Sequence, residues 1–280
     1  MHPLISTETL ARHLGDPSWI VFDCRHDLMA PAAGEASYRE GHIAGARFAP
    51  LDRDMSGSKD GRNGRHPLPT REAFVHFLAD AGVGRSSVVV AYDASNGLYA
   101  SRLWWLTRWI GHADVVVLDG GLPAWLRAGL SLTDAQPRPS TGDIALGASL
   151  VSTVDTSDLE ANLDTKSRLV IDARAPERYR GDVEPLDPVA GHIPGAANHP
   201  MARSLEADGR FRDASSLRAE FEATLGDRSP GSVVQSCGSG VTACHNLLAM
   251  EAAGLPGAAL YAGSWSAWCA DPRRPVARGE

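Results

Sequence analysis

The sequence of 280 residues contains few cysteines, and they are unevenly spaced. They are Cys24, Cys237, Cys244 and Cys269. Four cysteines in this arrangement do not make a disulfide framework, so we expect a protein of the reducing cytoplasm. The sequence contains neither a Cys-x-x-Cys pair nor a His-x-x-x-His pair. We therefore predict no metal site, and nothing in the sequence calls for a cofactor.

The sequence also lacks a basic excess and a long apolar run. The formal net charge is −7, and the Lys and Arg residues are scattered. This charge gives no field that attracts polyanions, so we expect no nucleic acid or membrane partner. No apolar stretch approaches the roughly 20 residues that span a bilayer. The opening residues 1–7 have no basic segment followed by an apolar one, which is not the pattern of an export signal.

Four short patterns occur twice in the same order. Each second copy follows the first by about 150 residues, as expected for a duplicated domain. Hydrophobic residues make up 43% of the chain, enough for two ordinary cores. The pairs are Trp19–Arg25 with Arg168–Arg174, Gly41–Ala46 with Gly191–Ala196, Ser87–Asp93 with Ser232–Cys237, and Leu118–Trp125 with Leu260–Trp268.

The segment between the halves is rich in turn formers. From Thr133 to Asp143 it has few apolar residues, which is typical of a linker. We predict a first domain over residues 1–135, a linker over 136–149 and a second domain over 150–280. Short apolar strands alternate with helical patterns such as Thr70–Ala81 and Ser215–Leu225. The fold class is thus α/β, with a mainly parallel sheet in each domain and helices on both faces.

Cys237 is the strongest candidate for a reactive residue. It follows an apolar strand pattern and precedes a helical one, so its sulfur should lie in a tight turn at a helix start. Gly238 and Gly240 allow the backbone to bend, and Ser239 and Thr242 add hydroxyl donors. Backbone N–H groups and the helix dipole favour a thiolate there, and only the thiolate is a nucleophile. The other interpretation is a buried structural cysteine.

The matching position in the first half is Asp93, which cannot carry a sulfane sulfur. The first half is therefore predicted to be a non-catalytic copy. A cysteine phosphatase would also place a thiolate at a helix start, but it needs an arginine six residues later to hold the phosphoryl oxygens. That position is Ala243, which argues against phosphatase chemistry.

The loop Cys-Gly-Ser-Gly-Val-Thr-Ala, the strand ending in Asp-x-Arg and the element Gly-His-Ile-x-Gly-Ala together resemble two-domain rhodanese-type sulfurtransferases over nearly the whole chain. Mercaptopyruvate sulfurtransferases carry this loop form, whereas thiosulfate-using relatives usually have Cys-Arg-Lys-Gly-Val-Thr-Ala. The resemblance implies that Cys237 becomes a persulfide and passes its sulfur to a thiol or to cyanide. Because Gly238 and Ser239 bring no cation, a donor with one carboxylate suits the loop better than dianionic thiosulfate.

The resemblance also implies further site residues. Arg178 matches an arginine that holds the donor's carboxylate, while Leu186 stands where animal mercaptopyruvate enzymes have a second arginine. His66 matches a histidine near the reactive cysteine, with Asp52 as its carboxylate partner, and could protonate the departing enolate. The loop itself supplies the remaining candidates for substrate binding, which are Gly238, Gly240, Val241 and Thr242.

Other conspicuous residues are interpreted as structural, or as less central to the site. His42 and His192 recur in both halves and should bond to backbone, and the Asp-x-Arg charges should organise strand ends. Arg62 and Arg65, in a glycine-rich loop, could guide anions inward. The tryptophans should pack in the cores.

Two alternatives stay open: a thiosulfate sulfurtransferase, and a persulfide carrier or binding module without multiple turnover. The acceptor also stays open between thioredoxin, glutathione, another protein thiol and cyanide.

Overall fold

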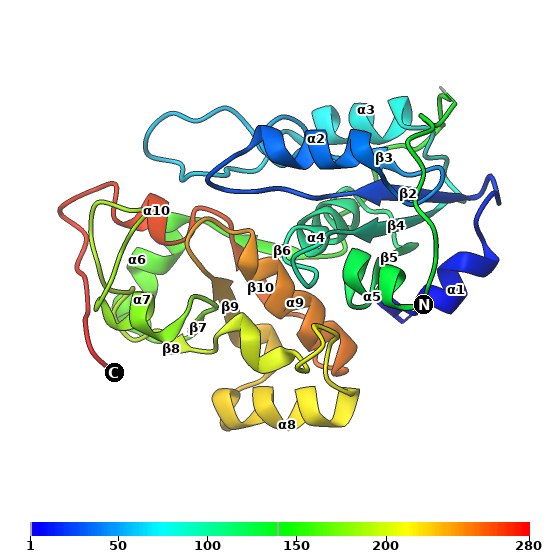
Figure 1. The fold of residues 1–280 in the computed structure, drawn as a ribbon. Helices are drawn as coiled ribbons and strands as arrows, with labels where there is room; N and C mark the ends of the chain where they lie inside the picture. The colour runs from blue at the N-terminus through cyan, green and yellow to red at the C-terminus, as the bar shows by residue number, and fades with distance from the viewer. Residues whose placement is uncertain (1, 139) are drawn as a thin grey trace. The chain divides into compact units, whose positions relative to one another are not determined.

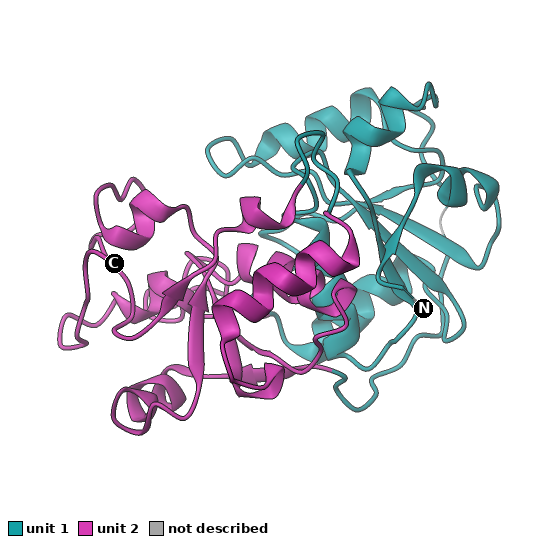
Figure 2. Cartoon of the chain, turned by 90° about the horizontal axis from the view of Figure 1, so that it is seen from below, with its two compact units in different colours: residues 1–57, 69–150, 206–211 teal, residues 58–68, 151–205, 212–280 magenta. Residues whose placement is uncertain are grey.

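The structure is a computed structural model that describes residues 2–138 and 140–280. Its chain forms two compact units (Figure 2). The first consists of Met1–Gly57, Pro69–Leu150 and Glu206–Phe211, and the second of Ser58–Leu68, Val151–Leu205 and Arg212–Glu280. Each unit therefore includes a short segment from the other half of the sequence.

The first unit alternates strands and helices (Figure 1). Its elements are β1 (Leu4–Ile5), α1 (Thr7–Arg12), β2 (Trp19–Asp23), α2 (Ala32–Glu40), β3 (Arg47–Phe48), α3 (Arg71–Asp80), β4 (Val88–Tyr92), α4 (Ala100–Trp109), β5 (Val115–Leu118) and α5 (Gly121–Arg127).

The second unit repeats this alternation. Its elements are β6 (Ser152–Val154), α6 (Thr156–Thr165), β7 (Leu169–Asp172), α7 (Pro176–Arg180), β8 (Ala197–Asn198), the 3₁₀ turn η1 (Met201–Ser204), α8 (Ala214–Leu225), the 3₁₀ turn η2 (Pro230–Ser232), β9 (Val233–Ser236), α9 (Thr242–Ala252), β10 (Ala259–Tyr261) and α10 (Ser264–Trp268).

The two sheets have the same topology. The first has the order β1-β5-β4-β2-β3 and the second β6-β10-β9-β7-β8, so corresponding strands occupy corresponding places. Every strand pairing in both sheets is parallel. The predicted α/β class with tandem parallel sheets is confirmed. β9, which leads into Cys237, is the central strand of its sheet, where the carboxyl ends of parallel strands provide a site for ligands.

Helices cover both faces of each sheet. In the first unit, Val21 packs with Leu10 of α1 and Trp125 of α5, whereas the next residue, Phe22, faces the ring of Phe77 in α3 at 5.6 Å. Successive strand residues point to opposite faces, so α1 and α5 cover one face and α3 the other (Figure 1). In the second unit, Val234 packs with the α6 and α10 side chains, and its neighbour Gln235 bonds to Asn246 of α9 at 3.2 Å.

The repeated charges and histidines have the structural roles expected from their duplication. Arg25 donates to the Asp23 carboxylate from Nη2 at 2.6 Å, and Arg174 donates to Asp172 from Nη2 at 2.7 Å. Nδ1 of His42 lies 2.8 Å from the carbonyl of Tyr38, and the His192 ring makes the matching contact with the Tyr179 carbonyl at 2.8 Å.

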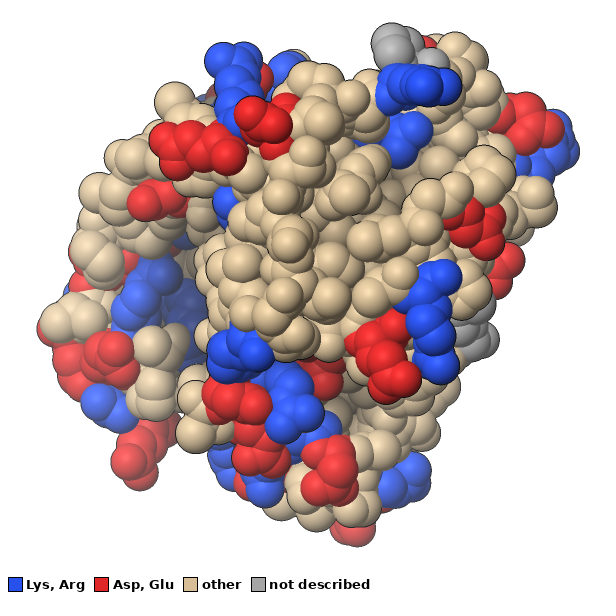
Figure 3. Space-filling model, turned by 45° about the vertical axis from the view of Figure 1, so that its right-hand side comes forward, with Lys and Arg blue, Asp and Glu red and all other residues tan. Residues whose placement is uncertain are grey.

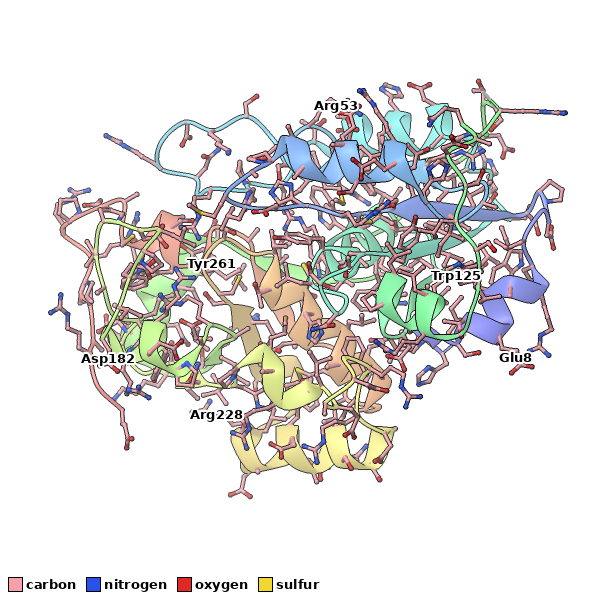
Figure 4. All side chains as sticks on the ribbon, in the orientation of Figure 1. Glu8, Arg53, Trp125, Asp182, Arg228 and Tyr261 are labelled. Carbon is pink, nitrogen blue, oxygen red and sulfur yellow. The ribbon has the colours of Figure 1, made fainter. Side chains whose placement is uncertain are left out.

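The tryptophans in helical or turn patterns are buried, except for the half-buried Trp109; they are Trp104, Trp105, Trp109, Trp125, Trp265 and Trp268. Trp125 of the first core and Tyr261 of the second are labelled in Figure 4.

The predicted linker packs largely on the first unit. The N–H groups of Gly142, Ile144 and Gly147 donate to the carbonyls of Ala79, Val83 and Ile110. Pro139, within that segment, lies outside the described residues. The predicted domain boundaries remain a prediction.

Charges of both signs are mixed on the face drawn in Figure 3, where Lys and Arg lie among Asp and Glu in small groups. Among residues 2–138 and 140–280, no helix combines the length and the apolar character that a membrane span requires.

The N-terminus of α3 offers a test of local stability. Thr70, the predicted N-cap, accepts a hydrogen bond at its Oγ1 from the Ala73 N–H at 3.1 Å. We expect Thr70→Ala to reduce the free energy of unfolding by about 1 kcal/mol, because it leaves a helix N–H without its acceptor. Thr70→Asp should retain most of the stability. Urea denaturation measures both, and equal midpoints for the two variants would contradict the capping role.

Candidate active site

The Cys237 sulfur is enclosed by the backbone of its own loop. Cys237 is 1% exposed and follows the last residue of β9. The N–H of Gly240 donates to Sγ at 3.1 Å and that of Ser239 at 3.4 Å. N–H groups converging on a sulfur stabilise its anionic form, so the loop can hold a thiolate without a neighbouring base.

Glycines make this turn possible. Gly240 has a φ of +78°, and a Cβ there would collide with the carbonyl oxygen of Ala262. Val241 and Thr242, the other residues proposed for the loop, begin α9: Val241 is its N-cap and Thr242 its first residue. The hydrogen bonds found at Sγ from loop backbone come from Ser239 and Gly240, not from these two residues.

Residues at the start of α10 hold the Cys237 loop in place through hydrogen bonds. Ser264 accepts a hydrogen bond from the Cys237 N–H at 3.1 Å and donates to the Tyr261 carbonyl at 2.8 Å. Its φ of 52° is unusual for a residue with a side chain. Trp265 and Ser266 donate N–H groups to the carbonyls of Cys237 and Gly238 at 2.9 and 3.0 Å. No motif in the sequence pointed to Ser264.

His66 lies at the same loop. It belongs to the segment Ser58–Leu68 of the second unit and is 4% exposed, so it is not an exposed loop histidine. Its Nδ1 lies 2.8 Å from Oγ of Ser239, and which atom donates depends on the tautomer. This hydrogen bond places the imidazole of His66 beside a hydroxyl group two residues from Cys237. Asp52 belongs to the first unit, and its partnership with His66 remains a prediction.

Two guanidinium groups flank Gly238. A Cβ at this position would lie 2.7 Å from Nη2 of Arg65 and 3.6 Å from both Nη atoms of Arg178. Arg178 is thus not a solvated helix charge, since its side chain is 18% exposed and faces the loop. A side chain at position 238 would make the end of the Arg65 side chain shift, whereas it would only contact Arg178.

Buried carboxylates hold the arginines. Glu184 accepts from Arg178 at 2.6 Å and from Arg174 at 3.3 Å. Asp187 forms an ion pair with Arg65 and lies 3.5 Å from Nη2 of Arg178. Burial acts to raise the pKa of Glu184, but hydrogen bonds from Arg178 and from backbone N–H groups outweigh it and lower that pKa. In the sequence, this stretch is conspicuous only because Leu186 stands where related enzymes have an arginine.

The corresponding loop of the first unit holds a carboxylate where the second holds sulfur. Asp93 is fully buried and accepts backbone N–H bonds of 2.7 to 2.9 Å from Ser95, Gly97, Tyr99 and Ala100. Burial raises the pKa of the Asp93 carboxyl, against the effect of these four donors. The side chain fills its own cradle of N–H groups, which fits a copy without a nucleophile.

Comparison with known proteins agrees with this geometry. The model of the rhodanese-like domain matches residues 6–128 and 155–271. A Pseudomonas aeruginosa protein named "Probable 3-mercaptopyruvate sulfurtransferase" is 46% identical over 279 residues, 99% of this chain and 98% of that protein. The thiosulfate sulfurtransferase of Cricetulus griseus is 33% identical over 294 residues, 99% of this chain and 96% of the relative. The solved structure of 3-mercaptopyruvate sulfurtransferase from Leishmania major has a TM-score of 0.81 at 30% identity, covering 94% of this chain and 73% of that one.

The chain therefore belongs to the rhodanese-like family and contains two copies of its domain. It is a sulfurtransferase of the group that includes the 3-mercaptopyruvate and thiosulfate enzymes.

Gly240→Ala tests the N–H cradle. We expect the alkylation of Cys237 by iodoacetamide at pH 7 to slow by about tenfold or more, because a Cβ cannot fit without moving the Gly240 N–H away from sulfur. Gly226 also has a positive φ, +59°, but open space around its Cβ position. Gly226→Ala is thus a matched control for backbone strain alone. Equal alkylation rates in both variants, mapped by peptide mass, would contradict the cradle.

The lowered pKa of Glu184 predicts that the stability of the protein depends on pH. Its pKa in the folded protein lies below the ordinary value of 4.5, so its stabilising effect is complete above that value and disappears as pH falls through the folded pKa. Glu184→Gln should be less stable than the parent at pH 7 by about 1–3 kcal/mol. The difference should shrink between about pH 5 and 3. Denaturant titrations measure the free energies of unfolding. If the difference between parent and variant stays constant across this pH range, the Glu184 carboxylate is not stabilised by the neighbouring arginines.

Proposed function

We propose that Cys237 takes a sulfane sulfur from 3-mercaptopyruvate and passes it to a thiol or to cyanide. The Cys237 thiolate attacks the donor's sulfur, an S–S bond forms, and the C–S bond breaks with its electron pair moving onto carbon. The products are a Cys237 persulfide and the enolate of pyruvate, which takes up the proton that the donor's thiol supplied. The acceptor then attacks the outer sulfur and releases the Cys237 thiolate.

The balance of charges around Cys237 supports mercaptopyruvate rather than thiosulfate as the donor. Three guanidinium groups, of Arg65, Arg174 and Arg178, face three carboxylates, of Asp172, Glu184 and Asp187. Gly238 and Ser239 add no cation. The cluster is neutral before the thiolate forms, so a dianion such as thiosulfate meets no net positive charge, whereas a single carboxylate needs only one set of guanidinium donors.

Each step has a candidate residue. Arg178, beside Gly238, is proposed to bind the donor's carboxylate. The 2.8 Å contact between His66 and Ser239 supports a path by which a proton reaches the enolate or a hydrogen bond reaches the donor's carbonyl oxygen. Asp52 is proposed to orient His66. The N–H groups of Ser239 and Gly240 stabilise the sulfur anion before attack and after transfer.

Donor preference is tested by specificity constants. Arg178→Ala should reduce kcat/KM for mercaptopyruvate. The loss of transition-state stabilisation given by the ratio of kcat/KM in parent and variant should be roughly 1.5–3 kcal/mol, the scale of a charged hydrogen bond. Ser239→Lys should shift the ratio of the two donors toward thiosulfate, because it supplies a cation at the loop. An unchanged donor ratio in Ser239→Lys would contradict the charge argument.

The same assay separates an enzyme from a carrier. Repeated turnover of mercaptopyruvate with cyanide supports the enzyme. One sulfur per chain without further turnover supports the carrier.

A further inference from the structure

The first unit contains a basic cavity that the proposed reaction does not use. Its walls come from β3, α3, the residues Arg53 and Asp54 and the predicted linker, all within this unit. Its volume is about 640 Å³, which is in the range of sites for small molecules. We propose that this cavity binds an organic phosphate, with Arg47 and Arg138 holding the phosphate group.

Arg47 is a half-buried cation without a carboxylate partner among the residues that the structure describes. Its Nη1 donates to the carbonyl of Gly45 at 3.2 Å and its Nη2 to Oγ of Ser140 at 3.0 Å, and both acceptors are uncharged. Burial lowers the pKa of Arg47. Burial acts in the same direction on Arg25, but the Asp23 carboxylate outweighs it and raises that pKa. A bound anion would supply the counter-charge that Arg47 lacks.

The second unit shows that the fold does not need a cation at this place. Arg47 begins β3 and pairs with Phe22 of β2, and the corresponding residue Ala197 begins β8 and pairs with Ile171 of β7. The same edge strand therefore forms with a small neutral side chain. Because the strand itself does not require the guanidinium group, its charge points to a role in the cavity.

The other charges of the lining leave an excess of cations. Arg138 is exposed and has no carboxylate partner within residues 2–138 and 140–280. Arg53 is already paired with Asp54, from Nη2 to Oδ2 at 2.8 Å, and Asp80 is the one other carboxylate of the lining that the structure describes. The lining is thus net positive in a chain whose net charge is −7. Guanidinium groups bind phosphate through paired hydrogen bonds, and His76 of α3 offers a further nitrogen donor.

The cavity also has apolar walls that an inorganic ion would leave uncovered. Phe77 and Pro137 line it together with the methyl groups of Ala73 and Ala81. A ligand with an apolar body next to its phosphate would bury these surfaces as well as meet the cations. This combination favours an organic phosphate over the free ion.

Gly82 allows the linker to reach the cavity. Its φ is +87°, and a Cβ there would collide with Oγ of Ser140 and lie 3.3 Å from Nη2 of Arg47. The linker can therefore approach closely enough for Ser140 to accept the hydrogen bond of Arg47. The same approach brings Arg138, two residues earlier, to the opposite wall of the cavity.

Isothermal titration calorimetry with phenyl phosphate tests the assignment at constant ionic strength. We expect Arg47→Ala to weaken binding about 10-fold or more, because it removes a charged donor, and Arg47→Lys to recover part of that loss. Arg12→Ala is a matched control, since Arg12 is an exposed arginine of the same unit on α1, across the sheet from α3. It should bind phenyl phosphate as the parent does.

Two further ligands separate the phosphate group from the organic part. Benzoate keeps the ring but has a single negative charge, and inorganic phosphate keeps the charge but has no ring. Both should bind more weakly than phenyl phosphate. Benzoate that binds as tightly would overturn the choice of phosphate, and inorganic phosphate that binds as tightly would overturn the choice of an organic ligand.

The place of binding is tested by a variant of the Cys237 site. Phenyl phosphate should bind Arg178→Ala as tightly as the parent, and a loss of binding there would assign the anion to the Cys237 site and overturn this inference. A parent protein that does not bind phenyl phosphate, or equal affinity in the parent and in Arg47→Ala, would also overturn it. If Arg47→Ala does not fold, Arg138→Ala decides, since Arg138 is exposed and its loss should weaken binding in the same way.

Discussion

The proposed chemistry depends on two backbone N–H groups that point at one sulfur atom. Ser239 and Gly240 donate to Sγ of Cys237, and neighbouring residues hold the loop in this conformation. Gly240 provides a conformation that other residues rarely adopt, and Ser264, Trp265 and Ser266 bond to the loop from the start of α10. Because β9 is the central strand of a parallel sheet, the loop lies where neighbouring strand ends can bring further groups.

The two units share one scaffold but have different residues after the central strand. Both keep the same strand order and the Asp-Arg pair at a strand end, yet the loop after β4 binds its own carboxylate and the loop after β9 surrounds a sulfur. In the first unit, the Asp93 carboxylate accepts hydrogen bonds from four backbone N–H groups. Duplication therefore preserved the scaffold, while the residue at the strand end determines whether a nucleophile is present.

Local patterns allowed much of this to be predicted from the sequence. The strand before Cys237, the glycines after it and the helix that follows are adjacent in the chain, so periodicity and turn chemistry located the loop, and the repeats predicted the duplicated α/β fold. The contacts that complete the site were not predictable in this way. Arg65 and Asp187 are 122 residues apart and His66 and Ser239 are 173 apart. No local rule pairs residues at such distances, so periodicity and turn chemistry could not predict these two contacts.

Whether Cys237 carries the transferred sulfur is tested by the mass of the Cys237 peptide after treatment with mercaptopyruvate. We expect a gain of one sulfur atom on this peptide, lost again when cyanide is added, and no gain in Cys237→Ser. Turnover of mercaptopyruvate without any sulfur on Cys237, or a sulfur found instead on Cys24, Cys244 or Cys269, would contradict this expectation.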